Sequence, residues 1–192
     1  AAGKSSVAAD WVGLGGIEFD ADQLAREVVE PGTQGFESVV REFGPGVVTG
    51  GRLDRAALGQ IVFGDATQRT KLEAIIHPLV KALAQERINN LPSSSIVIYN
   101  VPLLVEAAVD LNFDKVVTVE APTEKQLERL INIRKMDAAE ATARISSQAS
   151  PAARANAADV ILNSNQDLHL LLKDARKLWQ QIEHEAAQNG SH

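Results

Sequence analysis

The chain begins with residues that are typical of the second half of a phosphate-binding loop. Residues 1–6 read Ala-Ala-Gly-Lys-Ser-Ser and fit the end of the pattern G-x-x-x-x-G-K-[ST]. In such a loop the glycine lets backbone N–H groups curl around phosphate oxygens, the lysine reaches the terminal phosphates and the serine hydroxyl holds Mg²⁺. Because Gly-Lys-Ser also occurs in ordinary surface loops, the assignment depends on the rest of the chain. The residues predicted to bind ATP here are Ala1, Ala2, Gly3, Lys4, Ser5 and Ser6, with Ser5 as the Mg²⁺ ligand.

Two carboxylates are the second group of residues that could take part in binding or catalysis. Asp20 and Asp22 follow a short predicted strand at 17–19, and open α/β sheets place their ligands at the carboxyl ends of strands. Residues i and i+2 of a strand lie on one side, so both carboxylates are predicted to face the site. Either aspartate is also suited to cap the helix that follows. Arg26 comes one helical turn after Asp22, where it can bind a phosphate or pair with an acid.

The elements that position these residues alternate between strands and helices, which favours an α/β fold with a parallel sheet and helices on both faces. Periodicity and turn residues predict helices at 7–14, 23–29, 52–63, 67–91, 123–133, 138–148 and 167–187, and strands at 17–19, 95–100, 115–120 and 159–162. The stretch between the first two strands is almost entirely helical and longer than an ordinary crossover needs. We therefore expect a substrate-binding insert at 24–94.

A phosphate-binding loop normally follows a buried central strand of the sheet. We therefore expect about ten residues before Ala1, comprising a strand of roughly five or six residues and the start of the loop. An ordinary flexible terminus is the alternative.

Composition narrows the class of protein. The chain has 192 residues, enough for one domain with a sizeable core. It has no cysteine, which fits the cytoplasm and excludes disulfides and thiolate metal sites. The net charge of −6 and the aromatic content of 4% disfavour nucleic-acid binding, which usually needs clustered Lys and Arg or stacking platforms. No apolar run approaches the roughly 20 residues of a membrane span.

Four segments together resemble the dephospho-CoA kinase family of phosphate-loop kinases. They are Ala-Gly-Lys-Ser-Ser at 2–6, Phe-Asp-Ala-Asp at 19–22 running into Ala-Arg-Glu-Val-Val-Glu-Pro-Gly at 25–32, Ile-His-Pro at 76–78, and Val-Pro-Leu-Leu-Val-Glu at 101–106. The resemblance covers nearly the whole chain. It implies that ATP phosphorylates the ribose 3′-hydroxyl of dephospho-CoA, the last step of coenzyme A synthesis, with Mg²⁺ as cofactor.

The resemblance also implies roles for single residues. Asp22 is the expected catalytic base, which orients the ribose hydroxyl and accepts its proton. A lid is expected at 122–158, where Arg129 would act on the transferring group and Arg134 and Arg154 would bind ATP. Each arginine is otherwise a solvated salt-bridge partner. The residues expected on the substrate side are Asp22, Arg26, His77 and Glu106, of which His77 is otherwise a packed residue and Glu106 a helix cap.

The chain departs from the family pattern in three places. Asn100 stands where many family members have Asp, so the Mg²⁺ role of that position is in doubt. Lys135 stands where the family often has glycine, and the loop at 163–166, which tends to flank the adenine, reads Asn-Ser-Asn-Gln. Two alternatives therefore stay open: another small-molecule phosphate-loop kinase, or a non-catalytic nucleotide-binding protein. We expect a monomer or weak homo-oligomer without nucleic-acid or membrane partners.

Overall fold

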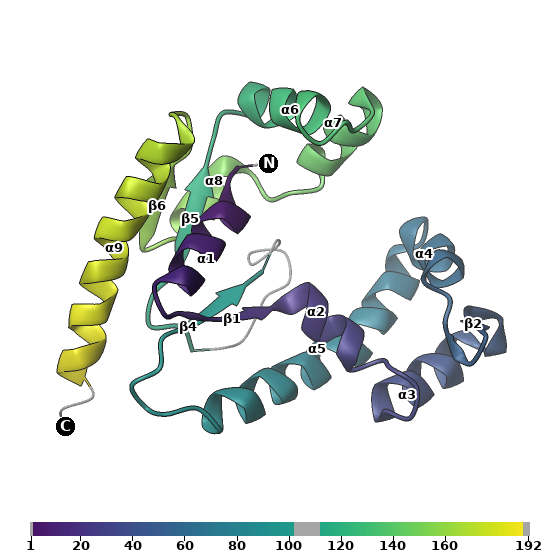
Figure 1. Cartoon of the computed structure of the whole chain (residues 1–192). Coiled ribbons are helices and arrows are strands. Elements are labelled where there is room, and N and C mark those ends of the chain that lie inside the picture. Colours follow the sequence, from purple (N-terminus) through teal and green to yellow (C-terminus); the bar gives the residue numbers. More distant parts are fainter. Residues whose placement is uncertain (1, 102–111, 190–192) are drawn as a thin grey trace. The chain divides into compact units, whose positions relative to one another are not determined.

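The computed structural model describes residues 2–101 and 112–189. These residues separate into two compact units. The first unit contains the described residues of 1–18, 93–98 and 102–192, and the second contains residues 19–92 and 99–101. Figure 1 shows the elements of both units along the chain.

Parallel strand pairing confirms the predicted α/β class. β5 (Val117–Glu120) pairs in parallel with β6 (Val160–Asn163), with Val117 opposite Val160 and Glu120 opposite Asn163. β1 (Ile17–Asp20) and β4 (Val97–Asn100) form another two-stranded sheet. The Ile17 N–H donates to the Ile96 carbonyl at 3.0 Å. The bounds of each of these four strands lie within two residues of the predicted ones.

Two helices enclose the core of the first unit. α1 (Lys4–Gly13) and α9 (Leu168–Asn189) lie side by side (Figure 1). The Trp11 and Trp179 rings are 5.7 Å apart between centroids, and the Trp11 Nε1 donates to the Ala175 carbonyl at 2.9 Å. This packing fixes the helix that follows the predicted phosphate loop. The buried core cluster consists of Val7, Trp11, Val119, Leu162, Leu171, Ala175, Leu178 and Trp179.

Three further helices follow β5 in the first unit: α6 (Thr123–Asn132), α7 (Ala138–Ser146) and α8 (Pro151–Asn156). The prediction missed α8, although the sequence carries its start signal. The Ser150 hydroxyl accepts from the Ala153 N–H at 3.1 Å, and Pro151 occupies the first helical turn. A serine cap before proline is a common way to begin a helix, because the missing proline N–H would have no helical partner.

The second unit is mostly helical. It contains α2 (Ala21–Glu27), α3 (Gln34–Phe43), α4 (Arg55–Phe63) and the long α5 (Ala66–Asn89). The other three helices each pack against α5. Pro78 lies inside α5, which continues through it as one helix.

A short hairpin in the second unit corrects one predicted boundary. β2 (Val48–Thr49) follows the 3₁₀ turn η1 (Pro45–Val47) and pairs antiparallel with β3 (Arg52–Leu53). The prediction that a helix begins at Arg52 is therefore wrong. Gly50 and Gly51 form the turn with φ of 61° and 77°. Two residues with positive φ give the turn that matches strand twist, and Gly-Gly is one of its common sequences.

Candidate functional site

Gly3 has a conformation that favours glycine and close neighbours. It precedes α1 with a φ of 97°, and its carbonyl accepts from the Ser6 and Val7 N–H groups at 3.0 and 3.2 Å. A Cβ on Gly3 would lie 3.0 Å from the Leu171 Cδ2 and 3.2 Å from the Ser164 Oγ. The left-handed backbone at this position favours glycine, and any larger residue would also displace the Leu171 and Ser164 side chains slightly.

Lys4, Ser5 and Ser6 form the first turn of α1, three residues earlier than the predicted helix start. Ser5 is exposed, Lys4 and Ser6 are half-buried, and this turn contains no acidic side chain. The backbone N–H groups that point outward at the start of a helix and the positive end of its dipole make such a turn favourable for anions in general. Ala2 directly precedes Gly3, and Ala1 lies outside the described residues.

Arg129 of α6 is bound to the loop that follows β6. Its Nη1 donates to the Ser164 Oγ and its Nη2 to the Ser164 carbonyl, both at 2.8 Å. Ser164 is only 1% exposed, and its N–H donates to the Glu120 carbonyl at 2.7 Å. The structure therefore brings together Gly3, Arg129 and Ser164. The sequence analysis did not predict a role for Ser164, although this residue lies in the polar loop at 163–166.

The other two predicted lid arginines have different surroundings. Arg154 donates through Nε and Nη2 to the two carboxylate oxygens of Glu120 at 2.9 and 2.6 Å, and through Nη1 to the Ala149 carbonyl at 2.5 Å. Arg134 is exposed just beyond α6. The next residue, Lys135, has a φ of 56°, a left-handed conformation that side chains other than glycine rarely adopt. This backbone explains why glycine suits that position.

The two aspartates of the second unit have separate local roles. Asp20 caps α2, because its Oδ1 accepts from the Asp22 and Gln23 N–H groups at 2.8 and 3.1 Å. Asp22 is exposed in the first turn of α2, and its carboxylate makes no hydrogen bond or ion pair with another described residue. The prediction that both aspartates share one side of a strand is wrong, because the helix begins at Ala21.

The remaining candidates of the second unit lie on two helices. Arg26 lies four residues after Asp22 on α2, and His77 is exposed on α5. Arg87 of α5 forms an ion pair with Glu27 of α2, and the hydrogen bond from Arg87 lowers the pKa of the Glu27 carboxyl. This pair links α5 to the helix that carries Asp22. Glu106 lies outside the described residues.

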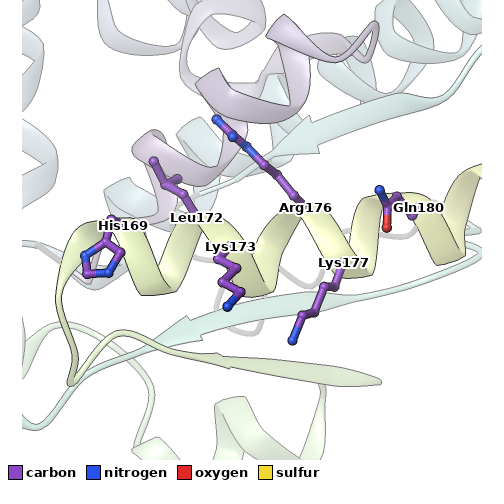
Figure 2. A pocket seen from close by; sticks show the side chains of 6 residues that line it. All are labelled: His169, Leu172, Lys173, Arg176, Lys177 and Gln180. Atoms are coloured by element: carbon purple, nitrogen blue, oxygen red, sulfur yellow. The ribbon is translucent and has the colours of Figure 1, made fainter.

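A hollow of about 380 Å³ lies along the outer face of α9 (Figure 2). Its lining includes Lys173 and Lys177, and Arg176, which pairs with Asp10 of α1 at 2.6 Å. All its lining residues come from α9, and none is a predicted phosphate contact, so we do not place the active site there. The lining residues are His169, Leu172, Lys173, Arg176, Lys177 and Gln180.

The described residues contain no metal-binding cluster and no membrane-spanning helix. Among residues 2–101 and 112–189, no group of three or more His, Cys, Asp or Glu side chains is placed to hold a metal ion. Over the same part of the chain, no helix has the length and apolar character needed to cross a bilayer.

Comparison with known proteins identifies relatives that match most of the chain. A sequence model of the family described as dephospho-CoA kinase matches residues 1–169. The dephospho-CoA kinase of Thermobifida fusca is 42% identical over 182 residues, which cover 94% of this chain and 91% of that protein. The dephospho-CoA kinase of Streptomyces avermitilis is 40% identical over 190 residues, covering 98% and 93%.

Solved structures have the same fold. The structure of TT1252 from Thermus thermophilus is similar with a TM-score of 0.81 at 32% identity, covering 92% of this chain and 90% of that one. The dephospho-CoA kinase from Campylobacter jejuni is similar with a TM-score of 0.70, covering 96% and 94%. Its identity of 24% supports the fold alone.

Proposed function

The chain belongs to the dephospho-CoA kinase family, and on that premise we propose which of its side chains carry the reaction. The reaction is the last step of coenzyme A synthesis. The ribose 3′-oxygen of dephospho-CoA forms a bond to the γ-phosphorus of ATP, the bond from that phosphorus to the bridging oxygen breaks, and ADP leaves. The local observation that best supports the assignment is the left-handed Gly3 at the start of α1.

ATP binds at the amino-terminal end of α1 in this proposal. Ala1, Ala2 and Gly3 supply backbone contacts, Lys4 reaches the terminal phosphates, and the positive end of the α1 dipole faces phosphate oxygens. Mg²⁺ is generally held by one or two protein oxygens together with substrate phosphates and water, and the exposed hydroxyl of Ser5 fits that pattern. When bound, the ion neutralises charge on the phosphates. Ser6 completes the turn.

Asp22 is the catalytic base in this proposal. It accepts the proton of the ribose 3′-hydroxyl while that oxygen attacks the γ-phosphorus. Two observations support the choice of Asp22 over Asp20. The Asp20 carboxylate already accepts two N–H groups as the cap of α2, whereas the Asp22 carboxylate is exposed and has no partner among the described residues.

The arginines have distinct proposed roles. Arg129 stabilises charge near the phosphates and holds the loop at 163–166 beside Gly3, in keeping with its two bonds to Ser164. Arg134 and Arg154 contact ATP when residues 122–158 act as a lid, and Arg154 must then exchange Glu120 for phosphate. Residues 24–94 form the substrate insert. Within it, Arg26 and His77 are proposed to contact dephospho-CoA, together with Glu106 beyond the insert.

We also propose a cellular location, an oligomeric state and cofactors for the enzyme. A net charge of −6 and a chain without cysteine fit a cytoplasmic enzyme of small molecules rather than a nucleic-acid-binding protein. We propose a monomer or weak homo-oligomer with ATP and Mg²⁺ as its cofactors.

Measuring product formation with different acceptors tests this function. With ATP and Mg²⁺, the protein is expected to phosphorylate dephospho-CoA, with far lower kcat/KM for adenosine or AMP. Preference for a nucleoside would indicate a different small-molecule kinase, and nucleotide binding without turnover would indicate a non-catalytic protein. Lys4→Ala is expected to abolish turnover while the protein stays folded, because the lost contacts are charge-assisted ones to phosphate. Lys173→Ala, on the outer face of α9, is the matched control.

A further inference from the structure

The second unit has a hollow that contains two arginines with no role in the site described above. Its volume is about 260 Å³, and it lies between the segment that follows α2, strand β3 and the first turn of α4. Arg52 and Arg55 supply its positive charge and Glu30 its negative charge. The other lining residues are Val29, Pro31 and Leu53.

The local fold fixes the backbone at both arginines. Arg52 follows the Gly50-Gly51 turn on β3 and is paired in register with Thr49. The Asp54 N–H donates to the Val47 carbonyl at 2.8 Å, and the Asp54 carboxylate accepts from the Ala57 N–H and the Thr49 hydroxyl at 3.0 and 3.1 Å. Asp54 is therefore the N-cap of α4, and it fixes the backbone of Arg55 at the first position of that helix.

The charges in this hollow are only partly balanced. Arg52 and Glu30 form an ion pair at 3.3 Å, but their side chains are 73% and 45% exposed. Exposed pairs are weak and exchange readily for another partner. The exposed side chain of Arg55 makes no ion pair with another described residue. A cation in the first turn of a helix also opposes the helix dipole, so local preference does not explain Arg55.

We propose that Arg52 and Arg55 bind the diphosphate of dephospho-CoA, an inference that rests on the proposed function. A guanidinium presents paired N–H donors that match phosphate oxygens and keeps its charge at all physiological pH values. Arg55 binds directly, and Arg52 exchanges Glu30 for the ligand. The Glu30 carboxylate disfavours the anion in this arrangement, and its charge limits the affinity.

The spacing within the second unit supports this assignment. From Asp22 to Glu27, the last residue of α2, the helix rises roughly 7.5 Å at about 1.5 Å per residue, and Val29 at the hollow lies two residues further along the chain. In dephospho-CoA five bonds join the 3′-oxygen to the nearer phosphorus, and at about 1.5 Å each they span at most roughly 7 Å. A hydrogen bond from the 3′-hydroxyl to Asp22 adds about 2.8 Å. The ligand therefore has the length to reach both.

The test is steady-state kinetics of single variants, with KM for dephospho-CoA measured separately from KM for ATP. Arg55→Gln and Arg52→Gln are each expected to raise KM for dephospho-CoA by about tenfold or more, the usual effect of losing a charge-assisted hydrogen bond, with kcat and KM for ATP within about twofold of wild type. Glu30→Gln is expected to lower KM for dephospho-CoA, which a merely structural role would not do. Arg69→Gln, an exposed arginine of α5, is the matched control and should change nothing.

Unchanged KM for dephospho-CoA in both arginine variants would overturn the inference. So would a joint change in kcat, both KM values and melting temperature, because that pattern indicates a structural role. Failure of the proposed function is distinguishable from either, since the wild-type protein itself would then not turn over dephospho-CoA.

Discussion

Arg129 and Ser164 are joined by two hydrogen bonds of 2.8 Å, and the Ser164 Oγ lies 3.2 Å from the place where a Cβ on Gly3 would stand. One buried serine thus connects α6, the loop after β6 and the phosphate loop. Because Ser164 is almost fully buried, its partners are not readily replaced by water. We therefore expect the order of the phosphate loop to depend on Arg129.

Arg129→Lys tests this dependence. Lysine keeps the charge but cannot donate in parallel to the hydroxyl and the carbonyl of Ser164. We expect the free energy of unfolding to fall by about 1.5–3 kcal/mol, the range for hydrogen bonds to charged groups, and ATP affinity to fall with it. Urea unfolding and ATP titration measure the two effects. Wild-type stability combined with a large loss of kcat would show that Arg129 acts on the phosphates alone.

Gly3→Ala is expected to lower stability by about 1–3 kcal/mol, the usual cost of a non-glycine residue in a strained backbone conformation, and to abolish tight ATP binding. The methyl group would meet Leu171 and Ser164, and the φ of 97° disfavours any side chain. Gly13→Ala is the matched control. A Cβ on Gly13 meets nothing within 4 Å, and alanine favours the helical conformation. Equal stability of the two variants would contradict this role of Gly3.

Lys135→Gly is expected to stabilise the protein. Lys135 has a φ of 56°, and the Met136 N–H closes the turn by donating to the Leu130 carbonyl at 3.1 Å. Glycine removes a backbone strain of about 1–2 kcal/mol but costs about 0.5–1 kcal/mol in chain entropy. The net gain should be between zero and about 1.5 kcal/mol in urea unfolding. Lys125→Gly, inside α6, should destabilise by a similar amount. A loss of stability in Lys135→Gly would rule out strain at this turn.

Asp54 predicts a pH dependence of stability. The Ala57 N–H hydrogen bond, helped by the Thr49 hydroxyl, holds the pKa of this carboxyl below its ordinary value of 3.8. Because the pKa of the Asp54 carboxyl is lower in the folded than in the unfolded protein, this group stabilises the fold. Its contribution to the free energy of unfolding is complete at pH values above the unfolded pKa and is lost as the pH falls through the folded pKa. Asp54→Asn should therefore be less stable than wild type at pH 7, with the difference shrinking below about pH 4. Urea unfolding at several pH values measures it, with Glu37→Gln as a control for net charge. A constant difference down to acid pH would contradict the assignment.

Local patterns predicted most of the fold. The bounds of the long helices α5 and α9 were predicted to within two residues. In α9 the buried residues Leu171, Ala175 and Leu178 repeat at helical spacing. Apolar spacing did not predict the hairpin at 48–53, because its two strands have only two residues each and show no periodicity. Only the Gly-Gly pair indicates a turn there. The helix predicted from Arg52 overran that hairpin for the same reason.

The residues of the candidate site that belong to a contiguous sequence motif could be predicted. Gly3 and Lys4 follow from the loop pattern, and Asp20 from the preference of aspartate for helix caps. The pairing of Arg129 with Ser164 was not predictable, because 35 residues separate the partners and only the packed fold brings them together. The hollow with Arg52 and Arg55 depends in the same way on the hairpin.

The most direct test of the whole account is the turnover of dephospho-CoA by Asp22→Asn beside Asp20→Asn. Asparagine keeps the size of aspartate but cannot accept the proton of the 3′-hydroxyl, and it also caps helices well. We expect Asp22→Asn to lower kcat by about 10²–10⁴ with ATP affinity unchanged, and Asp20→Asn to lose much less activity. A loss of less than about tenfold for Asp22→Asn, with a larger loss for Asp20→Asn, would contradict the assignment of Asp22 as the base.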